Sequence, residues 1–448
     1  MSETPYVSPS VVVIGAGIAG LTAAYRLSCA GVAVTVIEAS YHAGGRMSMA
    51  VREGYRIDRG AQFLSTGYEI IPELLRDVDL FDSLKTCSPW SGIVRNGKIR
   101  RVHSRGPATL ASSGLLKWCD LLRLGWHSGL DARRSKALPL NDYSAWHEWD
   151  DVEAAGWLKK RYGHEVVEYL LEPMLQGFYF QAPEGNSRAL PAWMNSFGAR
   201  HCQTIALDQG MGSLTGALAA KLDVRLNTPA LSVHHKADRA IIETSRGLLE
   251  ADRVIIATTA PVARQLCPPE TPLLQTLLDT RYSSTINLGI AFRDGLGETR
   301  IPDDVYGVLI PRNERKQIAA IGIESRKSRS LVPQGELLNV MLDGEAGKRL
   351  VNASEDAVLS EVLPELERYV PAAHQYMSFV HLNRWPQAEP LSPVGRSRAI
   401  AAYRASCTSM QRVVLAGDYL SVPTTEGAAH SGIWAADFLL DALNVRSR

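Results

Sequence analysis

The chain has 448 residues, of which 46% are hydrophobic and 21% are charged, and its formal net charge is +1. The balanced charge argues against a nucleic-acid partner, the lack of an apolar stretch of about 18 residues argues against a membrane span, and scattered cysteines without metal-ligand spacing predict no metal site. A chain of this length usually forms two or more lobes, and reduced thiols without an N-terminal export signal predict a cytoplasmic location.

The first predicted unit is a strand, a glycine turn, a helix and a second strand. Residues 11–14 are continuously apolar, as in a parallel strand buried on both faces. Glycines then follow with GxGxxG spacing, and a second strand over 32–37 ends in Glu38. Such a unit binds a dinucleotide, because the helix N-terminus offers N–H groups to a pyrophosphate and the acid can bind a ribose hydroxyl. The residues expected at this site, for NAD or FAD alike, are Gly15, Gly17, Ala19, Gly20, Glu38 and Ala39.

The residues after Glu38 separate FAD from NAD. Gly44–Gly45–Arg46 completes an ExxxxxGGR pattern, and a strand over 55–59 leads into a small-residue turn. This extended pattern resembles the superfamily of FAD enzymes that contains amine oxidases, protoporphyrinogen oxidases and phytoene desaturases. The resemblance implies that Gly44, Gly45 and Arg46 line the ADP half of FAD. It also implies that the turn formed by Gly60, Ala61, Gln62 and Phe63 lies by the isoalloxazine ring.

Residues 105–175 are predicted to be mostly helical, with apolar residues on amphipathic stretches. These residues are Trp118, Leu121, Leu122, Leu124 and Trp126. In membrane-attached protoporphyrinogen oxidases a comparable helical region meets the bilayer. Because apolar helical stripes usually face a core, we predict a helical cap over a pocket in preference to peripheral membrane contact.

The stretch from Glu172 to Phe180 resembles the EP–GxY stretch of protoporphyrinogen oxidases and their bacterial relatives. Its aromatic residues could form a wall for a flat or apolar substrate, although an aromatic packing cluster between lobes explains them equally well. The predicted pocket residues are Met174, Phe178, Tyr179, Phe180 and Trp385.

Two later segments agree with the resemblance. A helix over 210–222 precedes strands over 224–233, 240–244 and 252–257, and the backbone near Val233 is expected to face the adenine. Near the C-terminus, a strand ends in Gly–Asp and is followed by a helix whose N-terminus is expected to point at the flavin. The cofactor-binding residues expected in this second segment are Gly417, Asp418, Glu426, Gly427 and Ala428.

The sequence also departs from the amine-oxidase pattern. The lysine that amine oxidases place on a long substrate-domain strand aligns with Asn287, in the strand predicted over 283–292, and their cage aromatic aligns with Thr424. The segment 381–403 has no cysteine for a covalent flavin link, so FAD is expected to be non-covalent. These departures favour the protoporphyrinogen-oxidase-like branch.

No catalytic base stands out in the sequence. The weak candidates are Trp385, Asn287, His430 and His381, and a lone histidine is more often structural.

The resemblance implies an α/β fold with a Rossmann-like FAD-binding domain and an inserted α+β substrate domain that has a mixed sheet and a helical cap. The FAD domain is assigned to 1–75, 200–262 and 395–448, and the substrate domain to 76–199 and 263–394. The predicted function is an FAD-dependent oxidase or dehydrogenase that removes a hydride from a C–N or C–C bond of a small hydrophobic or amine-like molecule. O2 is its expected acceptor, with release of H2O2. The alternatives are a protoporphyrinogen- or phytoene-type desaturase or isomerase, and a non-catalytic binding protein of the same fold.

Overall fold

Five parallel strands from distant parts of the chain form the first sheet of the computed structural model, which describes residues 9–104, 106–200, 202–236 and 239–445. The strand order is β10-β2-β1-β14-β20. Their bounds are Asp223–Arg225, Ala33–Ile37, Ser10–Ile14, Arg253–Ile256 and Val413–Leu415. Three of them, β1, β14 and β20, are almost wholly buried, as their continuous apolar runs predict.

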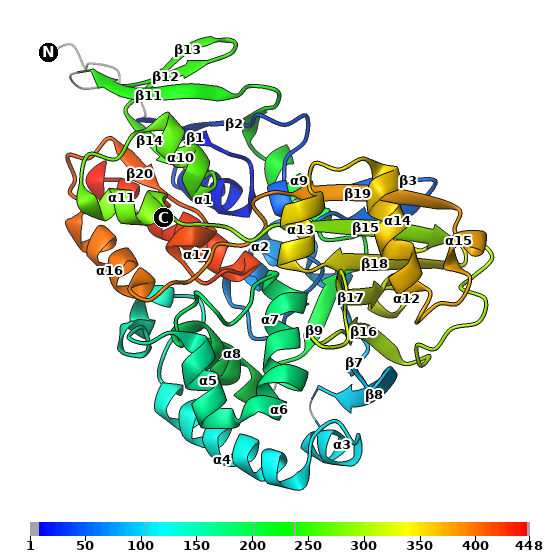
Figure 1. The fold of residues 1–448 in the computed structure, drawn as a ribbon. Helices are drawn as coiled ribbons and strands as arrows, with labels where there is room; N and C mark the ends of the chain where they lie inside the picture. Colours follow the sequence, from blue (N-terminus) through cyan, green and yellow to red (C-terminus); the bar gives the residue numbers. More distant parts are fainter. Residues whose placement is uncertain (1–8, 105, 201, 237–238, 446–448) are drawn as a thin grey trace, which may run out of the picture.

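Helices α1 (Ile18–Cys29) and α17 (Thr425–Ala442) pack against each other on one face of this sheet. They approach closely because residue 432 is glycine: a Cβ there would lie 2.2 Å from the Ala19 carbonyl oxygen. Figure 1 shows α17, in red, beside α1, in blue, so the two ends of the sequence build one lobe.

The prediction of one strand over 224–233 is wrong, because the structure divides this segment between two sheets. β10 joins the parallel sheet, whereas β11 (Ala230–Lys236) belongs to an antiparallel sheet with β12 (Arg239–Thr244) and β13 (Gly247–Ala251). The chain turns between them at Asn227, which has a positive φ of 50°. A single strand cannot pass through such a conformation, and Pro229 follows two residues later.

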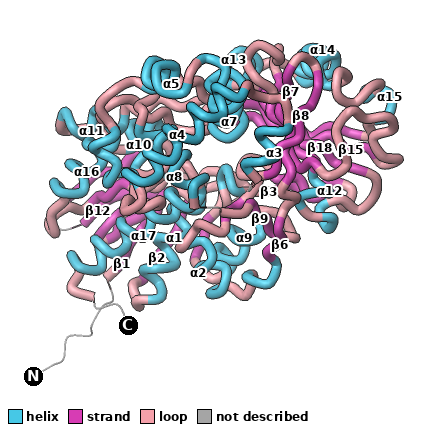
Figure 2. Tube along the Cα trace, turned by 90° about the horizontal axis from the view of Figure 1, so that it is seen from below, coloured by secondary structure: helices cyan, strands magenta, loops and turns pink. Residues whose placement is uncertain are grey.

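A seven-stranded mixed sheet forms the second lobe, in the order β19-β15-β18-β17-β16-β7-β8. The bounds are Phe379–Trp385, Thr285–Phe292, Glu336–Leu342, Ile318–Ile323, Val305–Leu309, Trp90–Arg95 and Lys98–His103. All pairs are antiparallel except β16 with β7. Every residue of β15 is buried, in agreement with the strand predicted over 283–292. Figure 2 shows the strands of this sheet gathered at one end of the molecule, with α10 (Ala260–Leu266), α11 (Pro272–Leu278) and α16 (Arg396–Ser406) at the other.

Most of residues 106–175 are helical, as predicted, residue 105 lies outside the described residues, and the helices continue to residue 199. The elements are α3 (Pro107–Ser112), α4 (Trp118–Ser135), a 3₁₀ helix (Tyr143–Trp149), α5 (Ala154–Tyr162), α6 (His164–Val166), a π-helical turn (Val167–Leu171), α7 (Glu172–Tyr179) and α8 (Ala189–Ala199). These helices lie below both sheets in Figure 1, with α4 along the lower edge. The predicted α/β fold with a mixed second sheet and a helical cap is therefore confirmed.

The predicted core face of α4 is partly wrong. Leu121 and Leu124 are half-buried and pack on the cluster beneath the helix, but Trp118, Leu122 and Trp126 are 73%, 72% and 69% exposed. The polar side of α4 faces inward instead, because Asp131 is buried in an ion pair with Arg161 and in a hydrogen bond from the Tyr162 hydroxyl.

The domain division remains a proposal, and one boundary needs adjustment. Leu277 and Leu278, in α11 (Pro272–Leu278), pack in the same cluster as Ile14 and Ile256 of the parallel sheet. We therefore propose that the third crossing between the domains lies near residue 282, not at 262.

Candidate functional site

The carboxyl ends of the parallel strands form the edge where the predicted FAD residues meet. Ile14 stands beside Ile37 and Ile256 in the sheet register, and Ile256 stands beside Leu415. The glycine turn, Glu38 and the Gly417–Asp418 pair directly follow three of these strand ends, so one edge collects segments that are up to 400 residues apart. Ligands of open α/β sheets bind at this edge.

The glycine turn before α1 leaves room for a ligand at Gly17 and at no neighbouring glycine. A Cβ on Gly15, whose φ is +106°, would lie 2.9 Å from the Ala257 carbonyl oxygen, and one on Gly20 would lie 2.0 Å from the Gly15 oxygen. A Cβ on Gly17 would meet nothing within 4 Å. Gly17 also gives α1 no side-chain cap, so the first N–H groups of this helix are free to bind an anion.

The Gly44–Gly45–Arg46 loop lies directly beside this turn. The Gly44 N–H donates to the Ala16 carbonyl at 2.7 Å, and both glycines have positive φ, +104° and +52°. The Arg46 guanidinium forms an ion pair with Asp418 at 2.5 Å, and the hydroxyl of Tyr282 donates to the other Asp418 oxygen at 3.0 Å. This loop therefore adds a guanidinium to the carboxyl edge of the sheet, a group suited to contact a diphosphate.

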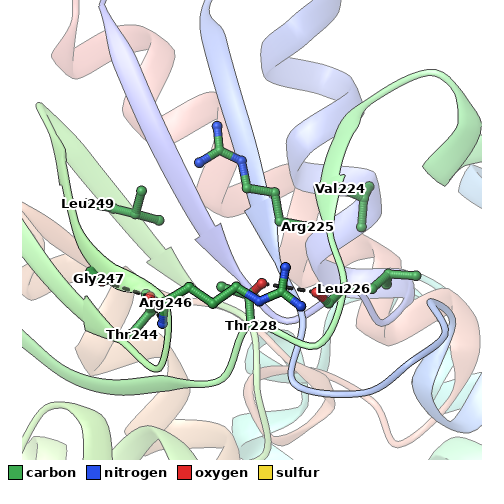
Figure 3. Close-up of a pocket in the computed structure, with 8 residues that line it drawn as sticks. All are labelled: Val224, Arg225, Leu226, Thr228, Thr244, Arg246, Gly247 and Leu249. Atoms are coloured by element: carbon green, nitrogen blue, oxygen red, sulfur yellow. Dashed lines mark hydrogen bonds between the residues drawn. The ribbon is translucent and has the colours of Figure 1, made fainter.

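Glu38 is held in place by the main chain. Its carboxylate accepts N–H groups of Ala16 and Ser40, each at 2.8 Å. Each carboxylate oxygen keeps further acceptor capacity for a ribose hydroxyl. The same edge of the sheet carries a surface groove of about 380 Å³ that the sequence analysis did not predict. Figure 3 shows its lining residues: Val224, Arg225, Leu226, Thr228, Thr244, Arg246, Gly247 and Leu249.

The turn at 60–63 packs on the backbone of Arg46. The Ala61 N–H donates to the Arg46 carbonyl at 2.8 Å, and a Cβ on Gly60 would lie 2.3 Å from that oxygen. The Phe63 ring meets Phe178 edge to face, with centroids 5.5 Å apart. The Gln62 side chain points away from this surface, because its amide is bonded within its own loop and to Lys327 and Asn339. Only the backbone of Gln62 can serve the cofactor.

Two of the weak catalytic candidates share one acceptor. The Asn287 amide and the Trp385 indole N–H both donate to the Arg59 carbonyl, at 3.0 and 2.7 Å. Their donors therefore hold the loop that precedes Gly60, and neither residue can act as a base through these groups. The Asn287 Oδ1 atom is buried without a hydrogen-bond partner, and a catalytic role for either residue stays a prediction.

The two histidine candidates have lowered basicity. Burial, followed by the positive charge of Arg404, lowers the pKa of His430. Burial and then the charge of Arg59 lower the pKa of His381. Both rings are therefore neutral at neutral pH. His430 faces the Arg404–Asp142 ion pair, which belongs to the packing between α16 and the helical cap.

Glu426 was expected to bind the cofactor, but its carboxylate is committed elsewhere. It accepts backbone N–H groups of Glu69 and Ile70 at 2.7 Å and of Ile71 at 3.0 Å, and it is 3% exposed. These donors form the otherwise unsatisfied N-terminus of α2 (Ile70–Asp77). Glu426 is therefore a cap for α2 and leaves the list of flavin contacts.

Thr424, which aligns with the cage aromatic of amine oxidases, caps a helix. The Thr424 hydroxyl accepts the Gly427 N–H at 2.9 Å and is the N-cap of α17. Gly427 and Ala428 stand in the first turn of α17. A Cβ on Gly427 would lie 2.2 Å from the Val422 carbonyl oxygen, so this glycine is required by the sharp entry into the helix.

The predicted substrate pocket is divided by the structure. Phe178 is 37% exposed beside Phe63 and fits a pocket wall. Tyr179 is buried in the core around the parallel sheet, whereas Met174 and Phe180 pack on a separate cluster with Leu309. The aromatic packing interpretation therefore holds for Tyr179, and the pocket assignment stays a prediction for the partly exposed residues Met174, Phe178, Phe180 and Trp385.

The Glu172 carboxylate of the EP–GxY stretch is fully committed to packing between the lobes. It accepts the Arg315 guanidinium at 2.6 Å, and Arg315 also pairs with Asp343 at 2.8 Å. Val233 packs its side chain in the core near the parallel sheet, and its contact with adenine stays a prediction.

Sequence reasoning missed three residues next to this site. Tyr282 binds Asp418, and Lys327 and Asn339 bind the Asp58–Gln62 loop. A fourth is Glu389, half-buried, whose pKa is raised by burial although the charge of Arg46 opposes the shift. None carries a motif, because their contacts are distant in the sequence: the hydrogen-bond partners of Tyr282, Lys327 and Asn339 lie 136, 269 and 277 positions away.

The residues present fit FAD. Gly17 leaves open space, and the uncapped end of α1 and Arg46 offer donors suited to a diphosphate. The Glu38 carboxylate offers acceptors suited to a ribose. The fold and this site define a flavin-dependent oxidoreductase.

Comparison with known proteins names the family. A family model described as flavin containing amine oxidoreductase matches residues 18–440, and the chain belongs to this family. Coproporphyrinogen III oxidase of Bacillus subtilis is 24% identical to it, over 93% of this chain and 94% of the relative. Protoporphyrinogen oxidase 2 of Arabidopsis thaliana is 24% identical, over 97% of this chain and 94% of the relative.

A solved structure shares the fold. Cyclohexylamine oxidase of Brevibacterium oxydans superposes with a TM-score of 0.78 at 18% identity, and the match covers 98% of this chain and 100% of that one. The protein is therefore an FAD-dependent oxidoreductase, with the flavin held non-covalently, as the sequence predicts.

Proposed function

We propose that this enzyme oxidises a porphyrinogen-type macrocycle, in preference to an amine, and passes the electrons to O2. The proposal is carried by the hydrogen bonds of Asn287 and Thr424, the two positions where amine oxidases place a lysine and a cage aromatic. Asn287, where amine oxidases place a lysine, is bonded to the Arg59 carbonyl, and Thr424, at the cage position, caps α17. Neither position carries the lysine or the aromatic ring that amine oxidases place there. The coproporphyrinogen III oxidase of Bacillus subtilis, alignable over nearly its whole length, supports the same substrate class.

The described residues contribute binding and orientation. Bound FAD supplies the hydride acceptor. Phe178 and Phe63 present an aromatic surface to a flat substrate. Trp385 and Asn287 fix the loop between the substrate sheet and Gly60. The α17 N-terminus adds a partial positive charge, which stabilises negative charge near it.

The test compares the two substrate classes on the purified FAD-loaded protein. Coproporphyrinogen III and protoporphyrinogen IX should yield porphyrin fluorescence faster than a protein-free control, with O2 uptake and peroxide release. Cyclohexylamine and putrescine should leave the flavin absorbance unchanged under anaerobic conditions. Bleaching by either amine, with no porphyrin formed above the control, would reverse the assignment. Porphyrin formation without O2 uptake would contradict O2 as the acceptor.

We further propose that α4 contacts an anionic membrane surface. Every fourth residue of its outer face is apolar and exposed: Trp118, Leu122, Trp126 and Leu130. Arg133 and Arg134 extend the same side of the helix and are exposed, whereas Asp131 points inward. Tryptophan, leucine and arginine without acidic residues are typical of a helix lying in a lipid interface. A second copy of the chain would bring like charges together, which disfavours a dimer through this face.

Vesicle sedimentation tests this contact. Among the described residues no helix is long and apolar enough to cross a bilayer, so binding should be peripheral and released by salt. The Trp118→Ser/Trp126→Ser variant should stay in the supernatant with phosphatidylglycerol vesicles that retain the wild type. The matched control Leu248→Ser removes a side chain of similar exposure (68%) from β13 and should bind normally. The proposal would be overturned if the wild type did not bind the vesicles. It would also be overturned if the wild type were a dimer and the double variant a monomer.

A cytoplasmic location stays a prediction. All six cysteines lie within the described residues and are free thiols, as expected in a reducing compartment.

A further inference from the structure

A fully buried lysine stands between the flavin-binding lobe and the substrate sheet. Lys327 ends α12 (Glu324–Lys327), the short helix between β17 and β18, and its side chain is 0% exposed. Its ammonium lies 2.8 Å from an Asp58 carboxylate oxygen, 3.3 Å from the Gln62 amide oxygen, and in an ion pair with Glu324. Burial lowers the pKa of Lys327, but the two carboxylates outweigh it and raise the pKa above its usual value. The residue is therefore a permanent charge in the core.

The partners of this ammonium lie in the segment 58–62, which leads into the flavin turn. The other Asp58 oxygen accepts the Met211 N–H at 2.7 Å, at the start of α9 (Gly212–Ala220). Asn339 of β18 donates to the Gln62 amide oxygen at 2.9 Å and to the Asp58 carbonyl at 3.2 Å. Helix α12, strand β18 and the start of helix α9 thus hold the five residues 58–62, and these elements come from both lobes.

The opposite side of the segment touches the predicted diphosphate site. Ala61 donates to the Arg46 carbonyl, and no side chain fits at Gly60 against the same oxygen. A shift of 58–62 must therefore move the Arg46 backbone and, with it, the guanidinium that pairs with Asp418. Close-packed interiors transmit such shifts instead of absorbing them.

We propose that Lys327 is a positioning residue for the flavin: through Asp58 and Gln62 it fixes the 58–62 segment against Arg46, so that the substrate sheet sets the geometry of the cofactor site. The proposal rests on FAD as the cofactor and is independent of the substrate. Lys327 touches neither a cofactor-facing surface nor a substrate, because its side chain is wholly enclosed.

The central experiment is Lys327→Met, with the dissociation constant of FAD measured on the apoprotein and the visible circular dichroism of the bound flavin recorded. The dissociation constant should rise roughly tenfold or more, the size expected when hydrogen bonds to a buried charge are lost. The dichroism should change because the flavin is held at a different angle.

Glu324→Gln is the matched control. Glu324 is as buried as Lys327 and contacts it, but no hydrogen bond joins its carboxylate to residues 58–62 in the described structure. This variant should bind FAD within about threefold of the wild type and keep the wild-type dichroism. Lys348→Met removes an exposed lysine of the same lobe and should change neither quantity.

Lys327→Met leaves the Asp58 charge uncompensated and can unfold the protein. The double variant Lys327→Met/Asp58→Asn removes the charges of Lys327 and Asp58 together and lacks the bond to Gln62; Glu324, whose pKa is raised by burial, remains in the core. It should fold and still show the altered dichroism. Wild-type affinity and dichroism in either variant would overturn the proposal, as would a Glu324→Gln variant that loses FAD to the same extent. A wild type that binds no FAD would overturn the cofactor assignment itself, which separates the two failures.

Discussion

At the scale of single residues, Glu324 is the buried acid with the clearest effect on stability. Burial raises its pKa from 4.5 to about 7, with the Lys327 charge opposing the rise and Asp58 adding to it. The folded state therefore holds a proton that the unfolded state has already released between these pH values. Its stabilising contribution is complete below pH 4.5 and is lost as the pH rises through about 7.

Glu324→Gln should remove this pH dependence. Between pH 4.5 and 8, the unfolding free energy of the wild type should fall relative to the variant by on the order of 3 kcal/mol. Denaturant unfolding of both proteins across this pH range measures the difference. Parallel profiles would mean that the Glu324 carboxyl does not change its protonation on folding.

Arg46 is the residue on which cofactor affinity depends most directly. Removing its guanidinium takes away a cation from the predicted diphosphate site and leaves the Asp418 carboxylate, 5% exposed, without its partner. Arg46→Met should raise the dissociation constant of FAD by at least roughly tenfold, measured by flavin fluorescence. Arg56→Met is a suitable control, because Arg56 bonds only an exposed carbonyl nearby. Equal affinity in the two variants would remove Arg46 from the site.

At the scale of elements, Glu426 joins α17 to α2. Glu426→Ala leaves three N–H groups at the N-terminus of α2 without their acceptor, and the unfolding free energy should fall by about 2 kcal/mol. Affinity for FAD should fall much less than in Arg46→Met. Thermal unfolding of the apoprotein and flavin titration measure the two effects separately. Unchanged apoprotein stability with lost FAD would restore Glu426 as a cofactor contact.

The elements also show where sequence reasoning succeeds. The sequence predicts strands β1, β14 and β20 because buried parallel strands consist of continuous apolar runs. The division of 224–233 was not, since a break at Asn227 depends on the hydrogen bond of its N–H to Ser40, a distant residue. The periodicity of α4 correctly predicts an apolar stripe, but periodicity alone cannot say that the opposite side is anchored inward by Asp131 and Arg161.

At the scale of the whole molecule, the cofactor motifs were predictable and the groups that support them were not. Each glycine turn is a local pattern with a local physical reason. The contacts of Asp58 with Lys327 and of Asn287 with Arg59 join residues 269 and 228 positions apart. Such pairs arise only when two lobes pack, and a single sequence carries no signal for them. The same distance explains why the bonds of Asn287 and Trp385 to the Arg59 carbonyl are not readable from the sequence.

The predicted FAD contacts come from distant parts of the chain, and this determines when the flavin should be released. The predicted FAD contacts run from Gly15 to Ala428, and most of them follow strands of one parallel sheet. Unfolding that sheet removes every contact together, so a non-covalent flavin must be released when the protein denatures.

Acid precipitation should therefore leave the yellow colour in the supernatant. In the folded protein, saturating FAD should stabilise the fold. At a hundredfold excess over its dissociation constant, the gain is about 2.7 kcal/mol, which corresponds to a rise of several degrees in the melting temperature. Differential scanning of apoprotein and holoprotein measures this rise. Flavin fluorescence that stays with the protein band on a denaturing gel would reveal a covalent bond, and an unchanged melting temperature would mean that FAD does not bind the folded sheet edge.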